Sequence, residues 1–225
     1  MISGPMFVPW QKSRAPECPY WSYGDLGLFL VTLAMLTLAL HVLVRLHFLP
    51  KVQLSHPSDG LQIAIVLYLT VSLYAVLKLR YRQPVLAPLG WIRPKPLQAS
   101  ASLGIGVTLG IVAALYQRAQ LPAVGIPPSW PLVLLAALLA PILEESLFRG
   151  CLFPLLASKV GDIVAVAITA GTFALFHGPT DLTHWISFGL TGIAYGLIRV
   201  ISGTTTAPAM AHSAYNLVLL STALM

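Results

Sequence analysis

The chain has 225 residues, of which 57% are hydrophobic and only 9% are charged, and its mean hydropathy is +0.81. These values lie outside the usual range of soluble domains and place the protein in a membrane. Despite a formal net charge of +6, the Lys and Arg residues form no continuous stripe and no nucleic-acid motif. We therefore expect contact with lipid head groups and no nucleic-acid partner.

The first 24 residues contain prolines, aromatic residues and two cations but no apolar core of signal-peptide length, so they are predicted to form an interfacial arm. Seven apolar segments follow, each near the roughly 20 residues that a helix needs to cross a bilayer. They cover residues 25–46, 61–79, 97–117, 131–157, 162–178, 183–200 and 204–224. The fourth contains Pro141 and Pro154, which predict a kink or division whose freed backbone groups need partners on neighbouring helices.

The sequence thus predicts an all-α, polytopic membrane helical bundle with seven transmembrane helices, or eight if the arm or the fourth segment hides a short one. Residues 25–225 form one membrane-embedded domain with a motif-bearing core at 131–225. Basic residues between the second and third segments place that loop in the cytoplasm by the positive-inside rule: Lys78, Arg80, Arg82, Arg93 and Lys95. Alternation gives a cytoplasmic N-terminus and an external C-terminus, and we expect the cell membrane of a prokaryote.

The stretch APILEESLFRG, residues 140–150, is the one place where acidic side chains lie deep in an apolar segment. A charge near the middle of a bilayer costs roughly 2.5–3.5 kcal/mol on insertion scales, so such groups are expected to be paired or used. Glu145 and Arg149 are four residues apart and are predicted to form a structural ion pair. Glu144 has no such partner in its own segment and is expected to be functional.

Two later segments carry polar groups at the same spacing. FALFH pairs Phe173 with His177, and HSAYN pairs His212 with Asn216. If the fourth and fifth segments form a hairpin, helix rise places Glu144 about 20 Å and His177 about 23 Å from its turn. The last segment begins on the same side of the membrane as that turn, and its His212 and Asn216 lie about 14 and 20 Å from its start. We therefore expect one polar cluster, built from three helices, within the membrane.

Such a cluster suits hydrolysis. A carboxylate in an apolar setting is a competent general base for water, and a histidine beside it can pass a proton to the leaving amine. A second histidine and a carboxamide can donate hydrogen bonds to the oxyanion of a tetrahedral intermediate. Because no serine or cysteine lies in a recognisable triad setting, the nucleophile is expected to be water.

The set EESLFR, FALFH and HSAYN resembles the three motifs EExxxR, FxxxH and HxxxN of the type II CAAX prenyl endopeptidase and bacteriocin-processing (CPBP, or ABI) family of intramembrane proteases. Their order and spacings agree. The resemblance implies an all-helical membrane protease, in a family usually given eight membrane helices, that cleaves a membrane-anchored protein or peptide. Prenylated C-terminal CAAX peptides, bacteriocin or pheromone precursors and C-terminal sorting tails are all substrates that fit.

Carried over residue by residue, the resemblance implies four catalytic positions. Glu144 would activate water together with His177, and His212 and Asn216 would form the oxyanion site. The family's mechanism is viewed as glutamate-driven and metal-independent, so no cofactor is expected.

Three further positions would support these. Glu145 and Arg149 would form an ion pair that orients the helix, and Phe173 would wall the cavity. A zinc-dependent mechanism is the less favoured alternative because the chain has no HExxH pair; it would use the two motif histidines and Glu144 as ligands.

The competing function class is a non-catalytic scaffold or maturation factor that binds a partner helix in the same cavity. An ion or proton carrier is a third class, because intramembrane acids and histidines also serve relays. As a protease, the protein would lose cleavage in a Glu144→Gln variant that still accumulates. As a scaffold, the same variant would keep its cellular phenotype.

Other conspicuous residues are assigned to packing and interfaces. His184 is close enough in sequence to His177 to line an entrance. Gly189, Gly192 and Gly196 repeat on one helix face, which is typical of close helix packing. Cys18 and Cys151 lie far apart, without metal-like spacing, and are predicted to be free thiols.

Overall fold

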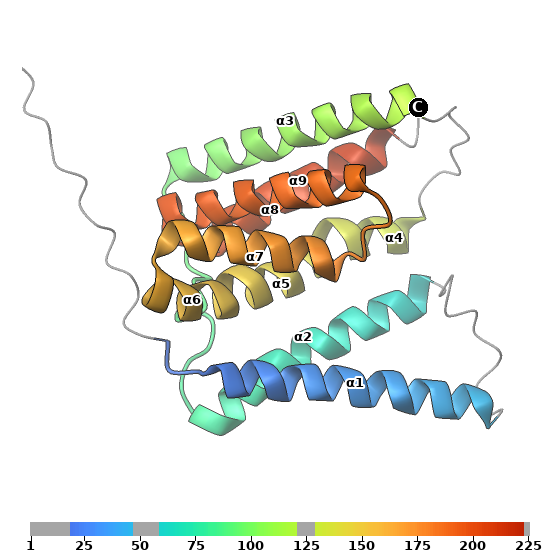
Figure 1. The fold of residues 1–225 in the computed structure, drawn as a ribbon, viewed down its shortest axis with the longest axis vertical. Coiled ribbons are helices and arrows are strands. Elements are labelled where there is room, and N and C mark those ends of the chain that lie inside the picture. Colours follow the sequence, from blue (N-terminus) through green and yellow to red (C-terminus); the bar gives the residue numbers. More distant parts are fainter. Residues whose placement is uncertain (1–18, 47–58, 121–128, 223–225) are drawn as a thin grey trace, which may run out of the picture.

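The computed structural model describes residues 19–46, 59–120 and 129–222, and these residues form helices without any strand (Figure 1). The first three helices are α1 Tyr23–Arg45, α2 Asp59–Tyr81 and α3 Pro96–Gln120. The central region contains α4 Trp130–Leu134, the π-helical stretch η1 Leu135–Leu139, α5 Ala140–Glu145, the π-helical stretch η2 Ser146–Leu152 and α6 Phe153–Val160. The last three are α7 Asp162–Phe176, α8 Leu182–Ser202 and α9 Thr206–Thr222.

The elements from α4 to α6 follow one another without a break and form a single long helix, Trp130–Val160. With this helix counted once, the described helices coincide with the seven segments predicted from hydropathy, which confirms the all-helical fold. The arm over residues 1–24 is a prediction that falls mostly outside the described residues, as does Cys18.

Four of the described helices are long and apolar enough to cross a membrane: Gly60–Tyr81, Pro96–Tyr116, Trp130–Val160 and Leu182–Ser202. The protein is therefore an integral, multi-pass membrane protein. The apolar part Tyr23–Met35 of α1 and the shorter apolar helix Asp162–Phe176 accompany them. The total of seven or eight crossings, the cytoplasmic N-terminus and the prokaryotic membrane stay predictions.

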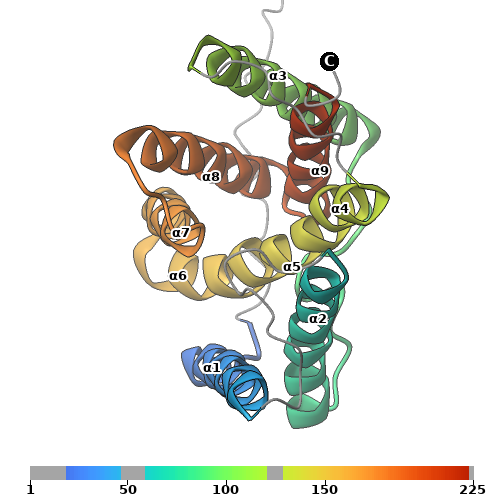
Figure 2. The same ribbon diagram turned by 90° about the vertical axis from the view of Figure 1, so that its right-hand side faces the viewer.

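The helices that carry the motifs occupy the middle of the molecule (Figures 1 and 2). In both views α1 and α2 lie at one end and α3 at the other. Helix α3 packs along α9, and α7 packs along α8. The long helix Trp130–Val160 contacts α2 through its first half and also packs against α9, so it joins the N-terminal pair to the motif-bearing helices.

The end of the predicted arm packs against this long helix. Trp21 is 3% exposed, and its indole Nε1 donates a hydrogen bond to the carbonyl of Cys151 at 3.1 Å. Asp25, also buried, accepts hydrogen bonds from Ser22 and from the Tyr81 hydroxyl and pairs with Arg80 at 3.0 Å. These contacts fix the start of α1 against the end of α2. Cys151 is a buried free thiol, as predicted.

The long helix changes from α-helical to π-helical geometry just before Pro141 and Pro154. Each π-helical stretch is followed by an α-helical segment with proline at its second position, Pro141 in α5 and Pro154 in α6. Arg199 of α8 donates from Nε to the Arg149 carbonyl at 3.2 Å, so a neighbouring helix supplies a partner inside the second stretch. The helix is thus distorted at its prolines but not divided, and the predicted need for a donor from another helix is confirmed at Arg149.

The glycine prediction for α8 is confirmed at two of three positions. A Cβ at Gly192 would lie 3.0 Å from the Ala170 Cα of α7, and one at Gly196 would lie 2.9 Å from the Val166 side chain. A Cβ at Gly189 would meet nothing within 4 Å, so close packing there is wrong.

A still closer approach joins α3 to α9. A Cβ at Gly106 would collide with the Ala211 carbonyl and lie 2.9 Å from its Cα, whereas a Cβ at Gly104 would meet nothing within 4 Å. We expect Gly106→Ala to lower the thermal unfolding temperature of the protein in detergent, because α3 must move away from α9. The control Gly104→Ala should keep or raise it, since Ala favours helix by up to about 1 kcal/mol over Gly. Equal unfolding temperatures would contradict the packing.

Candidate active site

Three helices bring a carboxylate and two imidazoles to one point. Oε2 of Glu144, on α5, lies 3.5 Å from Nε2 of His177 at the end of α7 and 3.9 Å from Nε2 of His212 on α9. The meeting predicted from helix rise is therefore confirmed for these three side chains. The Glu144 side chain is 13% exposed, and its Oε2 is buried without a hydrogen-bond partner among the described residues.

The second nitrogen of each imidazole is held by a different acceptor. Nδ1 of His177 lies 2.8 Å from the carbonyl oxygen of Phe173, and Nδ1 of His212 lies 3.0 Å from Oε1 of Glu145. A carbonyl and a carboxylate both only accept, so in each ring Nδ1 carries the proton. In the neutral ring, Nε2 is then a lone pair directed at Glu144.

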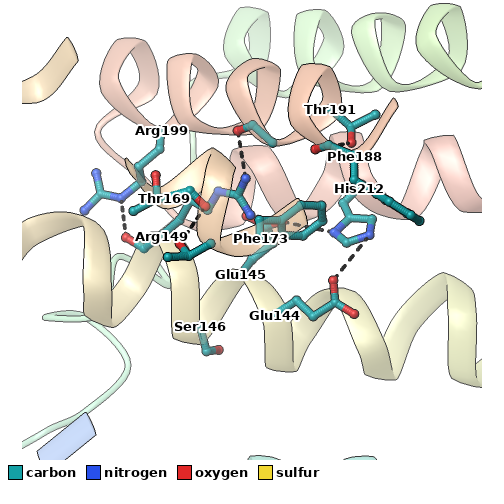
Figure 3. A network of polar contacts seen from close by, with 12 residues as sticks. Glu144, Glu145, Ser146, Arg149, Thr169, Phe173, Phe188, Thr191, Arg199 and His212 are labelled. Carbon is teal, nitrogen blue, oxygen red and sulfur yellow. Dashed lines mark hydrogen bonds and ion pairs between the residues drawn. The ribbon is translucent and has the colours of Figure 1, made fainter. Parts of the chain in front are cut away.

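Glu145 and Arg149 form the predicted ion pair, with Nη1 and Oε1 3.1 Å apart and both side chains 0% exposed. Figure 3 shows Arg149 turned away from Glu144 toward α8, where Nη2 donates to the Gly192 carbonyl at 2.8 Å. Oε1 of Glu145 thus accepts from Arg149 and from His212 together. Glu145 therefore does more than pair within its helix, because it also fixes an imidazole of α9.

Aromatic rings surround these groups. Phe173 contacts both imidazoles, with centroid distances of 4.4 Å to His177 and 5.8 Å to His212. The guanidinium of Arg149 lies 4.7 Å from the Phe173 centroid and 5.4 Å from that of Tyr195. Tyr195 in turn stacks on His212 at 4.8 Å. Such contacts favour a cation over the ring faces and restrict the imidazole orientations.

Asn216 makes its side-chain hydrogen bond outside the three converging groups. Its Nδ2 donates to the Ala136 carbonyl at 2.6 Å, in the first π-helical stretch. It lies one helical turn beyond His212 on α9. Its predicted share in an oxyanion site stays a prediction.

Stacked rings extend from His177 to His184 at the start of α8. Phe188 stacks on His177 at a centroid distance of 4.4 Å, and His184 stacks on Phe188 at 6.3 Å. His184 is exposed, with Nδ1 2.7 Å from Oδ2 of Asp181. The His184 backbone N–H, which donates to Asp181, is the main cause that lowers the pKa of that carboxyl below its usual value. His184 thus lies two rings from the site, consistent with the predicted entrance position.

Ser146 makes hydrogen bonds next to the site that the sequence patterns did not predict. Its hydroxyl donates to the Ile142 carbonyl at 2.6 Å, accepts from Trp91 Nε1 at 3.0 Å and lies 2.9 Å from the Tyr74 hydroxyl. Helix α2 and the loop before α3 therefore hold the residue that follows Glu145. The only available signal was a polar residue next to the glutamate pair.

Metal coordination was the less favoured alternative in the sequence. Among residues 19–46, 59–120 and 129–222, no group of three or more His, Cys, Asp or Glu side chains is arranged to hold a metal ion. What the converging groups do offer is one carboxylate oxygen and two imidazole Nε2 atoms directed at each other.

The fold and the site together define a multi-pass membrane protein with a buried glutamate–histidine centre. Residues 126–218 match the model of the family described as Type II CAAX prenyl endopeptidase Rce1-like. This match contains all three motifs and confirms the resemblance drawn from them, so the motif-bearing part of the chain is similar to this family of membrane proteases. The match begins after α3, and neither the curated proteins nor the solved structures contain a significant match to this chain.

Proposed function

We propose that the protein is an intramembrane endopeptidase that hydrolyses a peptide bond in a membrane-anchored protein or peptide, with Glu144 as the general base and without a metal. The observation that carries this proposal is the convergence of Glu144 Oε2 with two Nε2 atoms, at 3.5 and 3.9 Å. Glu144 Oε2 and the Nε2 lone pair of His177 are two acceptors at a distance that suits a hydrogen-bonded water between them. A water held by Glu144 and His177 is placed to lose a proton as it attacks a carbonyl carbon.

The two histidines receive different roles because their Nδ1 partners differ. The carbonyl at His177 orients a ring whose Nε2 can hold the water beside Glu144 and then pass a proton to the leaving amine. The carboxylate at His212 orients a ring that donates from Nε2 when both of its nitrogens carry a proton. His212 is therefore assigned to the oxyanion of the tetrahedral intermediate, together with Asn216.

The remaining residues prepare this chemistry. Glu145 and Arg149 hold the helix and the His212 ring, and Phe173 packs against both imidazoles. The family name supports a substrate of CAAX type, a C-terminal peptide at the membrane. C-terminal sorting tails and peptide precursors share the same chemistry, an amide bond near a membrane anchor.

The test is cleavage by the purified protein of a panel of membrane-anchored C-terminal peptides, prenylated and unprenylated, with and without chelator. We expect cleavage of at least one peptide, at the same rate in chelator. Loss in chelator that zinc restores would overturn metal independence. If the whole panel stays intact and Glu144→Gln complements a deletion strain as well as wild type does, the scaffold function replaces the protease.

A further inference from the structure

The two π-helical stretches of the long helix end in the same way. The Ala140 N–H donates to the carbonyl five residues earlier, Leu135, and the Phe153 N–H donates five residues back to Phe148. In each case the next residue is a proline, Pro141 or Pro154. If the same five-residue spacing continued, an N–H at position 141 would donate to the carbonyl of residue 136, and an N–H at position 154 would donate to the carbonyl of residue 149. Proline has no N–H, so neither carbonyl gains a donor there.

Each of these two carbonyls accepts a hydrogen bond from a side chain of another helix. Asn216 of α9 donates from Nδ2 to the Ala136 carbonyl at 2.6 Å. Arg199 of α8 donates from Nε to the Arg149 carbonyl at 3.2 Å. Since an unsatisfied carbonyl inside a membrane protein is costly, these side chains replace the donors that the prolines withhold.

The bond to Ala136 also fixes the orientation of the Asn216 carboxamide. A carbonyl oxygen only accepts, so the amide nitrogen, and not Oδ1, faces Ala136. One N–H of the amide is committed to this bond, and the second is held in a defined direction.

We propose that Pro141 is a positioning residue for Asn216. Because Pro141 has no backbone N–H, the Ala136 carbonyl is free to accept from the Asn216 amide. The second N–H of that amide then donates to the oxyanion. The inference rests on the proposed function only for this last step. A donor held before the reaction begins needs no reorganisation as negative charge develops.

Replacing Pro141 by Ala returns an N–H that competes with Asn216 for the Ala136 carbonyl. The released amide rotates, so kcat is expected to fall on the order of tenfold to a hundredfold. KM should stay near its wild-type value, because the oxyanion exists only in the transition state and intermediate. In an Asn216→Ala background the same replacement should lower kcat no further.

Pro154→Ala is the matched control. It returns a backbone N–H at the other π-helical stretch, where the side chain that it would displace from the carbonyl is Arg199 and not Asn216. We expect kcat close to wild type for this variant. Equal losses of kcat in the two proline variants would mean that general loosening of the helix, and not release of Asn216, lowers activity, and this would overturn the proposal.

A second readout needs no proteolysis. Asn216 is the only asparagine in the 225 residues, so ¹⁵N-asparagine labelling gives one side-chain amide signal. In wild type we expect two distinct amide protons, one of them exchanging slowly with solvent. Pro141→Ala should abolish this protection and Pro154→Ala should keep it.

The two readouts separate the possible failures. A fast-exchanging amide in wild type would overturn the anchoring even if Pro141→Ala does not fold. A protected amide in wild type that Pro141→Ala leaves unchanged would overturn the role of Pro141. If wild type shows the expected protection pattern but cleaves nothing, the proposed protease function fails while the anchoring stands.

Discussion

Glu144→Gln is expected to lower kcat by about two to four orders of magnitude, the usual contribution of a general base. The amide has nearly the shape of the carboxylate but takes no proton from water. The protein should still fold, because Glu144 takes no part in the buried pair of Glu145 and Arg149. Its Oε2 has no hydrogen-bond partner to lose among the described residues. Single-turnover cleavage of a membrane-anchored peptide measures the effect.

The matched control is Asp162→Asn, the same loss of a carboxylate at the exposed start of α7. This variant should cleave like wild type. Thermal unfolding in detergent should show both variants as stable as wild type. Cleavage by Glu144→Gln at the wild-type rate would remove Glu144 from the catalytic role and favour the scaffold function.

Much of the fold could be predicted because its signals are local. Hydropathy alone located the helices, since each is an uninterrupted apolar run in a chain with few charges. The spacing of four residues placed Glu145 beside Arg149, and helix rise brought Glu144 and His177 to one depth. These rules follow from the geometry of a single helix and need no knowledge of how helices pack.

The rest depends on how helices face each other, which no local pattern encodes. Glu145 contacts His212 across 67 residues of sequence, and Tyr74 reaches Ser146 across 72. The sequence pattern therefore predicted Glu145 as a partner of Arg149 alone. Likewise, the prolines predicted freed carbonyls but not that Arg199 and Asn216 would supply the donors.

Glu145→Gln is expected to lower kcat by about 10- to 100-fold, because His212 loses the carboxylate that holds its ring. His212→Ala should cost about 10²- to 10³-fold, the effect of removing one oxyanion donor. Since Glu145 acts through His212, adding Glu145→Gln to His212→Ala should lower kcat no further. Steady-state cleavage by the two single variants and the double variant measures this coupling. Additive losses would contradict it.

Stability complicates this test, because Glu145→Gln leaves Arg149 buried and unpaired, at a cost of about 3–5 kcal/mol. The variant Glu145→Gln/Arg149→Met removes both charges, and replacing a whole buried pair by neutral groups is often neutral for stability. If the pair is only structural, this double variant should regain both stability and activity. We expect it to regain stability and remain slow, because its His212 ring still has no carboxylate at Nδ1. Measuring the thermal unfolding temperature and kcat on the same preparations therefore shows whether Glu145 only stabilises the helix or also holds the His212 imidazole.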